Sequence, residues 1–183
     1  MKMQQFLRLC VAVAAFVTVA PMLAAAHGPT RQKTTQSVEI AAPPAAVWAV
    51  LSDFHNMSWL PGVEKTTGEG GNTPDVAKRV ITLKGGATVE ESLYKYDDAA
   101  MTYSYRIEKV DVKVLPVNNY SSTIAVLPGE NGGSKVEWRG AFYRGHPNND
   151  PPPELNDEAA VKAVNALYRA GLDNLKQQIE AKH

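Results

Sequence analysis

The sequence has 183 residues, 44% of them hydrophobic, and its 19 Lys and Arg residues balance 19 Asp and Glu residues. This balance, without a basic patch or a lysine run, excludes a nucleic-acid-binding surface built on phosphate contacts. The single cysteine, Cys10, lies in the N-terminal segment described next, so the rest of the chain has no disulfide, thiol nucleophile or thiolate metal ligand.

Residues 1–26 have the pattern of a secretory signal peptide. Two basic residues precede the apolar run LCVAVAAFVTVAPMLAAA, and Ala24 and Ala26 suit a cleavage that leaves His27 first. A transmembrane helix is the alternative, but Pro21 and the absence of basic residues straight after the run disfavour it. We therefore expect a periplasmic protein with no stable membrane insertion after cleavage.

The remaining residues, 27–183, are long enough for a single domain with its own core. Cleavage would remove Lys2 and Arg8 and no acidic residue. The domain would then carry 17 basic and 19 acidic residues, a net charge of −2.

The domain is expected to begin with a strand and two short helices. In TTQSVEI (34–40), residues alternate as in a half-buried strand. The prolines of AAPPAAVWAVLSDF (41–54) suit the approach and first turn of a helix, and its apolar residues recur at helical spacing. A second short helix is expected over 55–60, before Pro61 and Gly62 end it.

Six further strands are expected, separated by turn residues. They are VEKTTGE (63–69), VAKRVITLK (76–84), ATVEESLYKY (87–96), MTYSYRIEKV (101–110), NNYSSTIAVL (118–127) and KVEWRGAFYR (135–144). Adjacent strands joined by short turns predict an antiparallel meander.

The C-terminal segment predicts one long amphipathic helix. Asn156 is placed to cap it, and Asp157 and Glu158 lie in the first turn, where negative charge is favourable. Apolar residues then recur every three or four positions as far as Ile179 and form one stripe. Gly171 interrupts this stripe at a cost of about 1 kcal/mol relative to alanine, so we expect close packing against another element there.

Together these elements predict an α+β domain. The long helix has a single apolar face, and the sheet needs a cover for one of its own faces. A strongly curved antiparallel β-sheet of about seven strands, wrapped around the C-terminal helix, satisfies both needs. Sheet and helix cannot touch everywhere, so a cavity is expected between them.

Six segments also carry a family resemblance that covers about the whole of 27–183. They are SVEIAAPPAAVWAVLSDFHNMSWLPGV, EESLYKYDD, YSYRI, LPVNNYSSTIAV, KVEWRGAFYR and LYRAGLDNLKQQIE. These segments resemble the START-like or SRPBCC superfamily, whose fold is called helix-grip, and within it the polyketide cyclase/dehydrase-like group. The signal peptide together with RAGLDNLK looks most like the MxaD-type periplasmic accessory proteins of bacterial methanol oxidation.

The resemblance implies a hydrophobic cavity under the long helix and no fixed catalytic residue, because members bind lipids, hormones or polyketides and only some are enzymes. Similarity to MxaD-type proteins implies a helper role in electron transfer between methanol dehydrogenase and its cytochrome c, rather than catalysis. No cofactor is expected. Residues 84–87 and 115–118 resemble the mobile entrance loops of the superfamily. In related plant-hormone receptors, a glutamate and a tyrosine that match Glu91 and Tyr120 line the pocket.

The stretch SDFHNMSWLPGV (52–63) contains the residue types of a serine hydrolase. A catalytic triad needs nucleophile, base and orienting group to converge in space. Ser52 and Asp53 on a helix would point about 100° apart, and no G-x-S-x-G motif is present. We therefore expect this stretch to end a helix, with Asp53 and Asn56 in turn hydrogen bonds, and we predict no catalytic residue.

The histidines do not predict a metal site, because no H-x-H or H-E-x-x-H spacing occurs. His27 at a freshly cut N-terminus could chelate copper if His146 met it. Solvent-exposed histidines are the simpler interpretation, so no metal is expected.

Glu91 is the strongest candidate for a polar group inside the cavity. It shares one strand face with Val89 and Leu93, where a lone carboxylate would be costly. An odd-numbered loop after the preceding strand would put Arg79 on the same face as Glu91, and a two-residue turn would put them on opposite faces. We favour the odd loop because it turns the apolar neighbours inward together. Glu91 would then be paired and ionised, or unpaired with a raised pKa; a solvated position at the sheet rim is the alternative.

Aromatic residues are expected to complete the cavity wall. Tyr103 and Tyr105 share a face, as do Trp138 and Phe142; such residues usually fill cores, but buried tyrosine hydroxyls need partners and would give a pocket a polar lining. Trp59 is expected to close the mouth. The residues predicted to line the cavity are Trp59, Arg79, Ile81, Leu83, Glu91, Tyr103, Tyr105, Tyr120, Trp138, Phe142, Val164 and Tyr168.

Three functions agree with these patterns. The first is a non-enzymatic periplasmic protein that binds a small hydrophobic molecule or assists methanol dehydrogenase and its cytochrome c. The second is a cyclase- or dehydratase-like enzyme, in which Glu91 takes a proton beside a carbonyl and a tyrosine stabilises the oxyanion. The third is a periplasmic lipid carrier.

Overall fold

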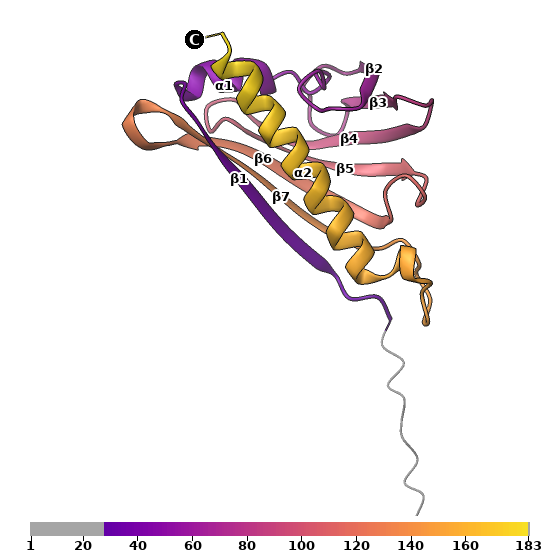
Figure 1. Cartoon of the computed structure of the whole chain (residues 1–183). Helices are drawn as coiled ribbons and strands as arrows, with labels where there is room; N and C mark the ends of the chain where they lie inside the picture. Colours follow the sequence, from indigo (N-terminus) through magenta and orange to yellow (C-terminus); the bar gives the residue numbers. More distant parts are fainter. Residues whose placement is uncertain (1–27, 183) are drawn as a thin grey trace, which may run out of the picture.

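A computed structural model of the chain describes residues 28–182. In this part of the chain a curved sheet holds the long C-terminal helix, which runs diagonally across one face of the sheet (Figure 1). The predicted signal peptide (1–26), His27 and His183 lie outside the described residues.

Seven antiparallel strands form the sheet, as the sequence predicted. They are β1 (Gln32–Ile40), β2 (Val63–Glu69), β3 (Lys78–Leu83), β4 (Thr88–Asp97), β5 (Thr102–Val110), β6 (Val117–Pro128) and β7 (Ser134–Arg144). Their order across the sheet is β1-β7-β6-β5-β4-β3-β2. Strands β2 to β7 thus form the expected meander, and β1 adds to its far end by pairing with β7, with Val38 opposite Val136.

The β3–β4 loop determines which residues face the core. Thr82 pairs with Thr88, and the backbone N–H of Leu83 donates to the carbonyl of Ala87 at 2.8 Å. Three residues, 84–86, therefore form the loop, and its two glycines have positive φ angles of 102° and 85°, which suit residues without a Cβ. The odd-numbered loop is confirmed, and it puts Arg79 directly opposite Glu91.

One helix, α1 (Pro44–Leu51), follows β1, with proline in its first turn. The second helix expected over 55–60 is wrong: residues 52–62 form successive turns. Short polar side chains take the backbone groups that a helix would use. Asp53 accepts from the N–H of His55 at 2.9 Å, and Asn56 accepts from the N–H of Ser58 at 3.2 Å and donates to the carbonyl of Val50 at 2.9 Å.

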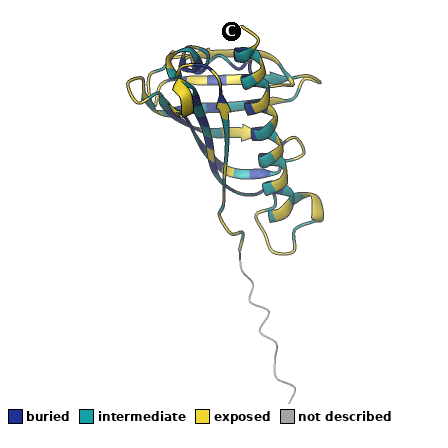
Figure 2. Cartoon of the chain, turned by 60° about the vertical axis from the view of Figure 1, so that its left-hand side comes forward, coloured by how far each residue is buried: buried dark blue, intermediate teal, exposed yellow. Residues whose placement is uncertain are grey.

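The long helix α2 (Asp157–Glu180) begins where the sequence predicted, and the Asn156 side chain accepts from the N–H of Ala159 at 2.8 Å. The 3₁₀ turn η2 (Pro153–Leu155) comes directly before α2. Another 3₁₀ turn, η1 (Glu130–Gly132), lies between β6 and β7. The apolar stripe of α2 faces the sheet, as the burial colours show (Figure 2). The close packing expected at Gly171 is confirmed, since a Cβ there would lie 2.9 Å from side-chain atoms of both Leu60 and Trp138.

Helix α2 packs mainly on β1 and β7, at one end of the strand order. Strands β3, β4 and β5 lie further along the sheet, and the turns of 52–62 and the side chains of the inner face fill the space beside the helix. This arrangement leaves the candidate site between α2 and the central strands.

Candidate functional site

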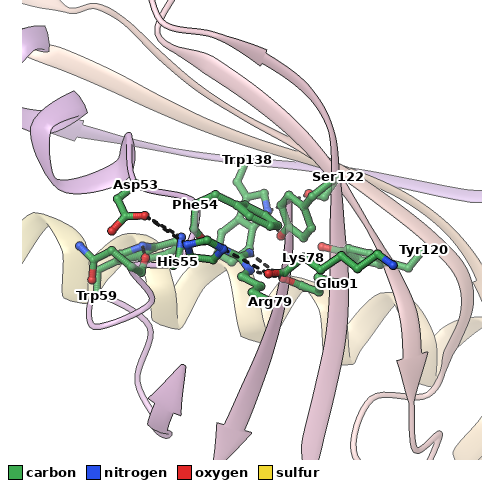
Figure 3. A network of polar contacts seen from close by, with 12 residues as sticks. Asp53, Phe54, His55, Trp59, Lys78, Arg79, Glu91, Tyr120, Ser122 and Trp138 are labelled. Carbon is green, nitrogen blue, oxygen red and sulfur yellow. Dashed lines mark hydrogen bonds and ion pairs between the residues drawn. The ribbon is translucent and has the colours of Figure 1, made fainter. Parts of the chain in front are cut away.

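A buried ion pair joins the neighbouring strands β3 and β4 at the site (Figure 3). Arg79 is 1% exposed and Glu91 is 6% exposed. The Nε and Nη2 atoms of Arg79 both lie 2.6 Å from Oε2 of Glu91, and Nη1 donates to the carbonyl of Phe54. Glu91 is therefore inside the molecule and paired, as the loop parity implied, and it is not solvated at the sheet rim.

Aromatic rings surround the guanidinium of Arg79. Its Cζ lies 4.1 Å from the centroid of the Phe54 ring and 5.1 Å from that of Tyr105. Ring faces attract a cation, most strongly where water is excluded. These rings replace part of the hydration that the arginine loses on burial.

The pair has opposing effects on its own ionisation. Burial raises the pKa of Glu91, and the charge and hydrogen bond of Arg79 act in the opposite direction. Burial lowers the pKa of Arg79, but Glu91 and the nearby tyrosines outweigh this and raise it. Burial is the larger effect on Glu91, so its pKa is raised overall, while the two guanidinium nitrogens against one carboxylate oxygen favour the ionised form of the pair.

A second polar cluster connects β5, β6, β7 and α2. The hydroxyl oxygens of Tyr120 and Tyr168 lie 2.5 Å apart, and the Tyr168 hydroxyl lies 3.0 Å from Oγ of Ser122. Nε1 of Trp138 donates to Ser122 at 2.8 Å and to the Tyr105 hydroxyl at 3.2 Å. Burial raises the pKa of Tyr105, Tyr120 and Tyr168, so all three are neutral donors and acceptors at physiological pH.

The cavity beside these clusters has a volume of about 100 Å³ and a wall made mostly of apolar atoms. Its lining residues are Met57, Leu60, Ile81, Leu83, Val89, Glu91, Tyr105, Ile107, Val114, Leu115, Tyr120, Trp138 and Leu167. Six of the twelve residues predicted from the sequence are among them. These are Ile81, Leu83, Glu91, Tyr105, Tyr120 and Trp138.

The other six predicted residues lie in the core and do not line the cavity. They are Trp59, Arg79, Tyr103, Phe142, Val164 and Tyr168. Trp59 is 1% exposed and packs edge-on against Trp138 with ring centroids 5.2 Å apart, so it does not close a mouth. The periodicity of strands and helices identified which residues face inward, but it could not show which of these line the cavity and which pack in the core around it.

Sequence reasoning also missed part of the wall and one polar partner. The missed lining residues are Met57, Leu60, Val89, Ile107, Val114, Leu115 and Leu167. The sequence could have identified Val89 as a lining residue, because it lies two residues before Glu91 on β4 and shares its face of the strand. Ser122, which holds Trp138 and Tyr168 together, carried no signal beyond its inward phase on β6.

The partly exposed lining residues indicate where the cavity opens. Val114 is 38% exposed, and Leu83, Ile107 and Leu167 are half-buried. These positions adjoin the β3–β4 loop, the β5–β6 loop and the outer edge of α2. The two segments that resemble entrance loops, 84–87 and 115–118, adjoin this opening.

The residues of the hydrolase-like stretch do not converge. Nε2 of His55 lies 3.1 Å from the carbonyl of Lys78, and its Nδ1 is 3.9 Å from Asp53. Asp53 and Asn56 make the turn hydrogen bonds expected of them.

Within residues 28–182, no group of three or more His, Cys, Asp or Glu could hold a metal ion. His27, the copper candidate, is outside this range.

Over the same described range, no helix combines the length and the apolar character needed to cross a membrane.

Comparison with known proteins gives one family and several similar structures. Residues 31–180 match the family model described as polyketide cyclase / dehydrase and lipid transport. The protein XoxI from Bacillus cereus is 32% identical, with a TM-score of 0.69 over 82% of this chain and 98% of its own. A protein from Thermobifida fusca is 27% identical, with a TM-score of 0.63 over 80% of this chain and 92% of its own.

A norcoclaurine synthase mutant from Thalictrum flavum, in complex with a transition-state analogue, has a TM-score of 0.59 over 85% of this chain and 98% of its own. At 20% identity it shares the fold alone. No curated protein matches the chain.

Proposed function

Because the chain belongs to the polyketide cyclase/dehydrase and lipid transport family of START-like, helix-grip proteins, we propose that it binds a small, mostly apolar molecule and catalyses no reaction on it. The observation that carries this proposal is the state of the polar groups around the cavity. Glu91 is held by Arg79, and the Tyr120 hydroxyl is held by Tyr168. An apolar cavity in which Arg79 already balances the charge of Glu91 and the Tyr120 hydroxyl already has a partner is suited to holding a ligand.

The contacts of Glu91 favour binding over the cyclase- or dehydratase-like alternative. A general base takes a proton from its substrate, and for Glu91 this would neutralise the charge that balances Arg79. Arg79 contacts Oε2 of Glu91 through two nitrogens at 2.6 Å, and protonation of that carboxylate would leave the arginine charge buried without a partner. The two tyrosine hydroxyls of the cavity wall are likewise engaged: that of Tyr120 contacts Tyr168, and that of Tyr105 accepts from Trp138.

The size of the cavity favours a small ligand over the lipid-carrier alternative. Pockets for drug-sized ligands have volumes of roughly 300–1,000 Å³, whereas this cavity has about 100 Å³. An acyl chain would require α2 or the two loops at the opening to move apart.

We further propose that the protein acts in the periplasm and assists a methanol dehydrogenase and its cytochrome c. The support is the signal-peptide pattern of residues 1–26 and the resemblance of RAGLDNLK to MxaD-type proteins. Deletion of the gene should reduce methanol-dependent respiration, and growth on a multicarbon substrate is the control. Unchanged respiration on methanol would contradict this role and leave ligand binding untouched.

Ligand binding is tested with a matched pair of Val→Phe variants on the paired strands β3 and β4. Val89 lines the cavity, whereas Val80 is 36% exposed and does not line it. In an NMR titration with toluene, the wild type should show saturable shifts at Ile81 and Ile107. Val89→Phe should abolish them because the added ring occupies the cavity, and Val80→Phe should retain them. Absence of saturable binding to the wild type would overturn the proposal.

A further inference from the structure

We infer that the cavity selects neutral ligands about the size of one phenol ring that carry a single hydrogen-bond donor, and that this donor binds Oε1 of Glu91. The inference rests on the proposed binding function and names the ligand class of the same cavity.

The geometry of the ion pair leaves one carboxylate oxygen available. Arg79 places both of its contacting nitrogens, Nε and Nη2, on Oε2 of Glu91. A paired arginine and carboxylate often use both oxygens in parallel hydrogen bonds, but this pair does not. The described residues donate no hydrogen bond to Oε1, and Glu91 is part of the cavity wall.

An ionised carboxylate oxygen is a strong acceptor, and leaving it without a donor in an apolar space is costly. A hydrocarbon ligand would displace water from Oε1 and offer nothing in exchange. A ligand with a hydroxyl or N–H group would satisfy the acceptor, and hydrogen bonds to charged groups are among the stronger ones. The unused oxygen therefore favours a donor-bearing ligand over its hydrocarbon analogue.

The charges around the cavity favour a neutral ligand. A ligand carboxylate would bring a second negative charge beside Glu91 in a poorly hydrated space, which is unfavourable. A ligand ammonium would lose its hydration for a carboxylate whose charge Arg79 already balances. A neutral hydroxyl or amine group avoids both costs.

The volume of the cavity limits the ligand to roughly a single ring. An engineered apolar cavity of about 150 Å³ in another protein binds benzene. The cavity here has about 100 Å³, and it is partly open at Val114. Phenol is therefore a suitable probe, with toluene as the analogue of similar size that lacks the donor and benzoate as the anionic analogue.

The test compares the affinities of phenol, toluene and benzoate by NMR titration of the full chain. Phenol should bind roughly tenfold more tightly than toluene, which corresponds to one modest hydrogen bond to a charged acceptor, and benzoate should give no saturable shifts. Equal affinities for phenol and toluene would overturn the inference and leave the proposed function intact. Binding of none of the three would overturn the proposed function, and the inference with it.

A variant assigns the preference to Glu91. The double change Arg79→Met with Glu91→Met removes both charges together, because a buried ion pair can be replaced by apolar residues of similar size without loss of folding. In this variant the preference for phenol should disappear while toluene still binds. A retained tenfold preference would show that another group receives the donor, and would overturn the assignment. The single variant Glu91→Gln, compared at a temperature where it is folded, should reduce the preference in the same direction.

Discussion

Gly140 on β7 lies so close to Tyr168 on α2 that a Cβ at position 140 would stand 2.2 Å from the tyrosine hydroxyl oxygen. The missing side chain leaves the space in which this hydroxyl contacts Tyr120 and Ser122. One glycine on the sheet thus allows the helix and the polar cluster beside the cavity to meet.

Gly140→Ala should therefore destabilise the protein. The added methyl group would displace the Tyr168 hydroxyl, so packing strain and the loss of buried hydrogen bonds would combine. We expect the free energy of unfolding to fall by about 2–4 kcal/mol, measured by urea denaturation.

The control removes the atom that clashes. In a Tyr168→Phe background the nearest ring atom would be 3.2 Å from the new Cβ, so Gly140→Ala should cost at least ~1 kcal/mol less there than in the wild type. Equal costs in both backgrounds would show that the hydroxyl is not what makes the glycine necessary.

Glu91→Gln tests the buried ion pair. The change leaves the Arg79 charge buried without its partner, so the free energy of unfolding should fall by about 3–5 kcal/mol. The double change to methionine at both positions should be close to neutral or stabilising. A single variant as stable as the wild type would mean that water reaches Arg79 and that the pair is not buried in solution.

The buried tyrosines predict a loss of stability at alkaline pH. Burial raises the pKa of Tyr103, Tyr105, Tyr120 and Tyr168 in the folded state, whereas in the unfolded chain each has a pKa of about 10. Both states are protonated below that pH, so the full stability is present there. Above it only the unfolded state loses protons, and the free energy of unfolding should fall by up to about 1.4 kcal/mol per pH unit for each tyrosine.

Tyrosinate absorbance measures this effect. Of the seven tyrosines in the chain, these four should stay protonated until the protein unfolds, and they should then ionise together with the loss of the circular dichroism of the folded state. All seven should ionise near pH 10 in concentrated urea, about the unperturbed value. Smooth ionisation of all seven in the folded protein would contradict the burial of the cluster.

In the Gly171→Ala variant, a gain in helix propensity is opposed by a steric clash with neighbouring side chains. Alanine is favoured over glycine in a helix by about 1 kcal/mol, but its Cβ would lie 2.9 Å from the Trp138 ring and 3.0 Å from the Trp59 ring. The rings cannot move aside cheaply, so we expect a net loss of about 1–3 kcal/mol in the free energy of unfolding. Ala166→Gly, at an exposed position of α2, measures the propensity alone. A stabilised Gly171→Ala variant would show that the rings can give way.

The sequence was most informative where one local period or one turn decides the outcome. The alternation of β4 put Val89, Glu91 and Leu93 on one face, and the parity of the β3–β4 loop put Arg79 opposite Glu91. The helical stripe and the Asn156 cap located α2. Each depends on residues close together in the chain.

The sequence was less informative where local signals compete or where distant elements meet. A helix ended by Pro61 and Gly62 is expected over 55–60, but the side chains of Asp53 and Asn56 take the backbone groups and form turns. Trp59 and Leu60 are both buried beside Gly171, yet Leu60 lines the cavity and Trp59 does not. Their difference depends on the position of α2 relative to this segment.

The amino-acid sequence by itself determined the seven strands, the long helix and their inward faces, and it favoured a carboxylate and an arginine on one inner face, because side-chain direction follows the local periods of strands and helices. Only the tertiary structure decided that the cavity is small, that both arginine contacts fall on one oxygen of Glu91, and which inward residues form its wall. The cavity is the small volume left between a curved sheet and a helix after their side chains have packed. The size and lining of this cavity depend on the curvature of the sheet and the placement of the helix, which no local periodicity of the sequence specifies.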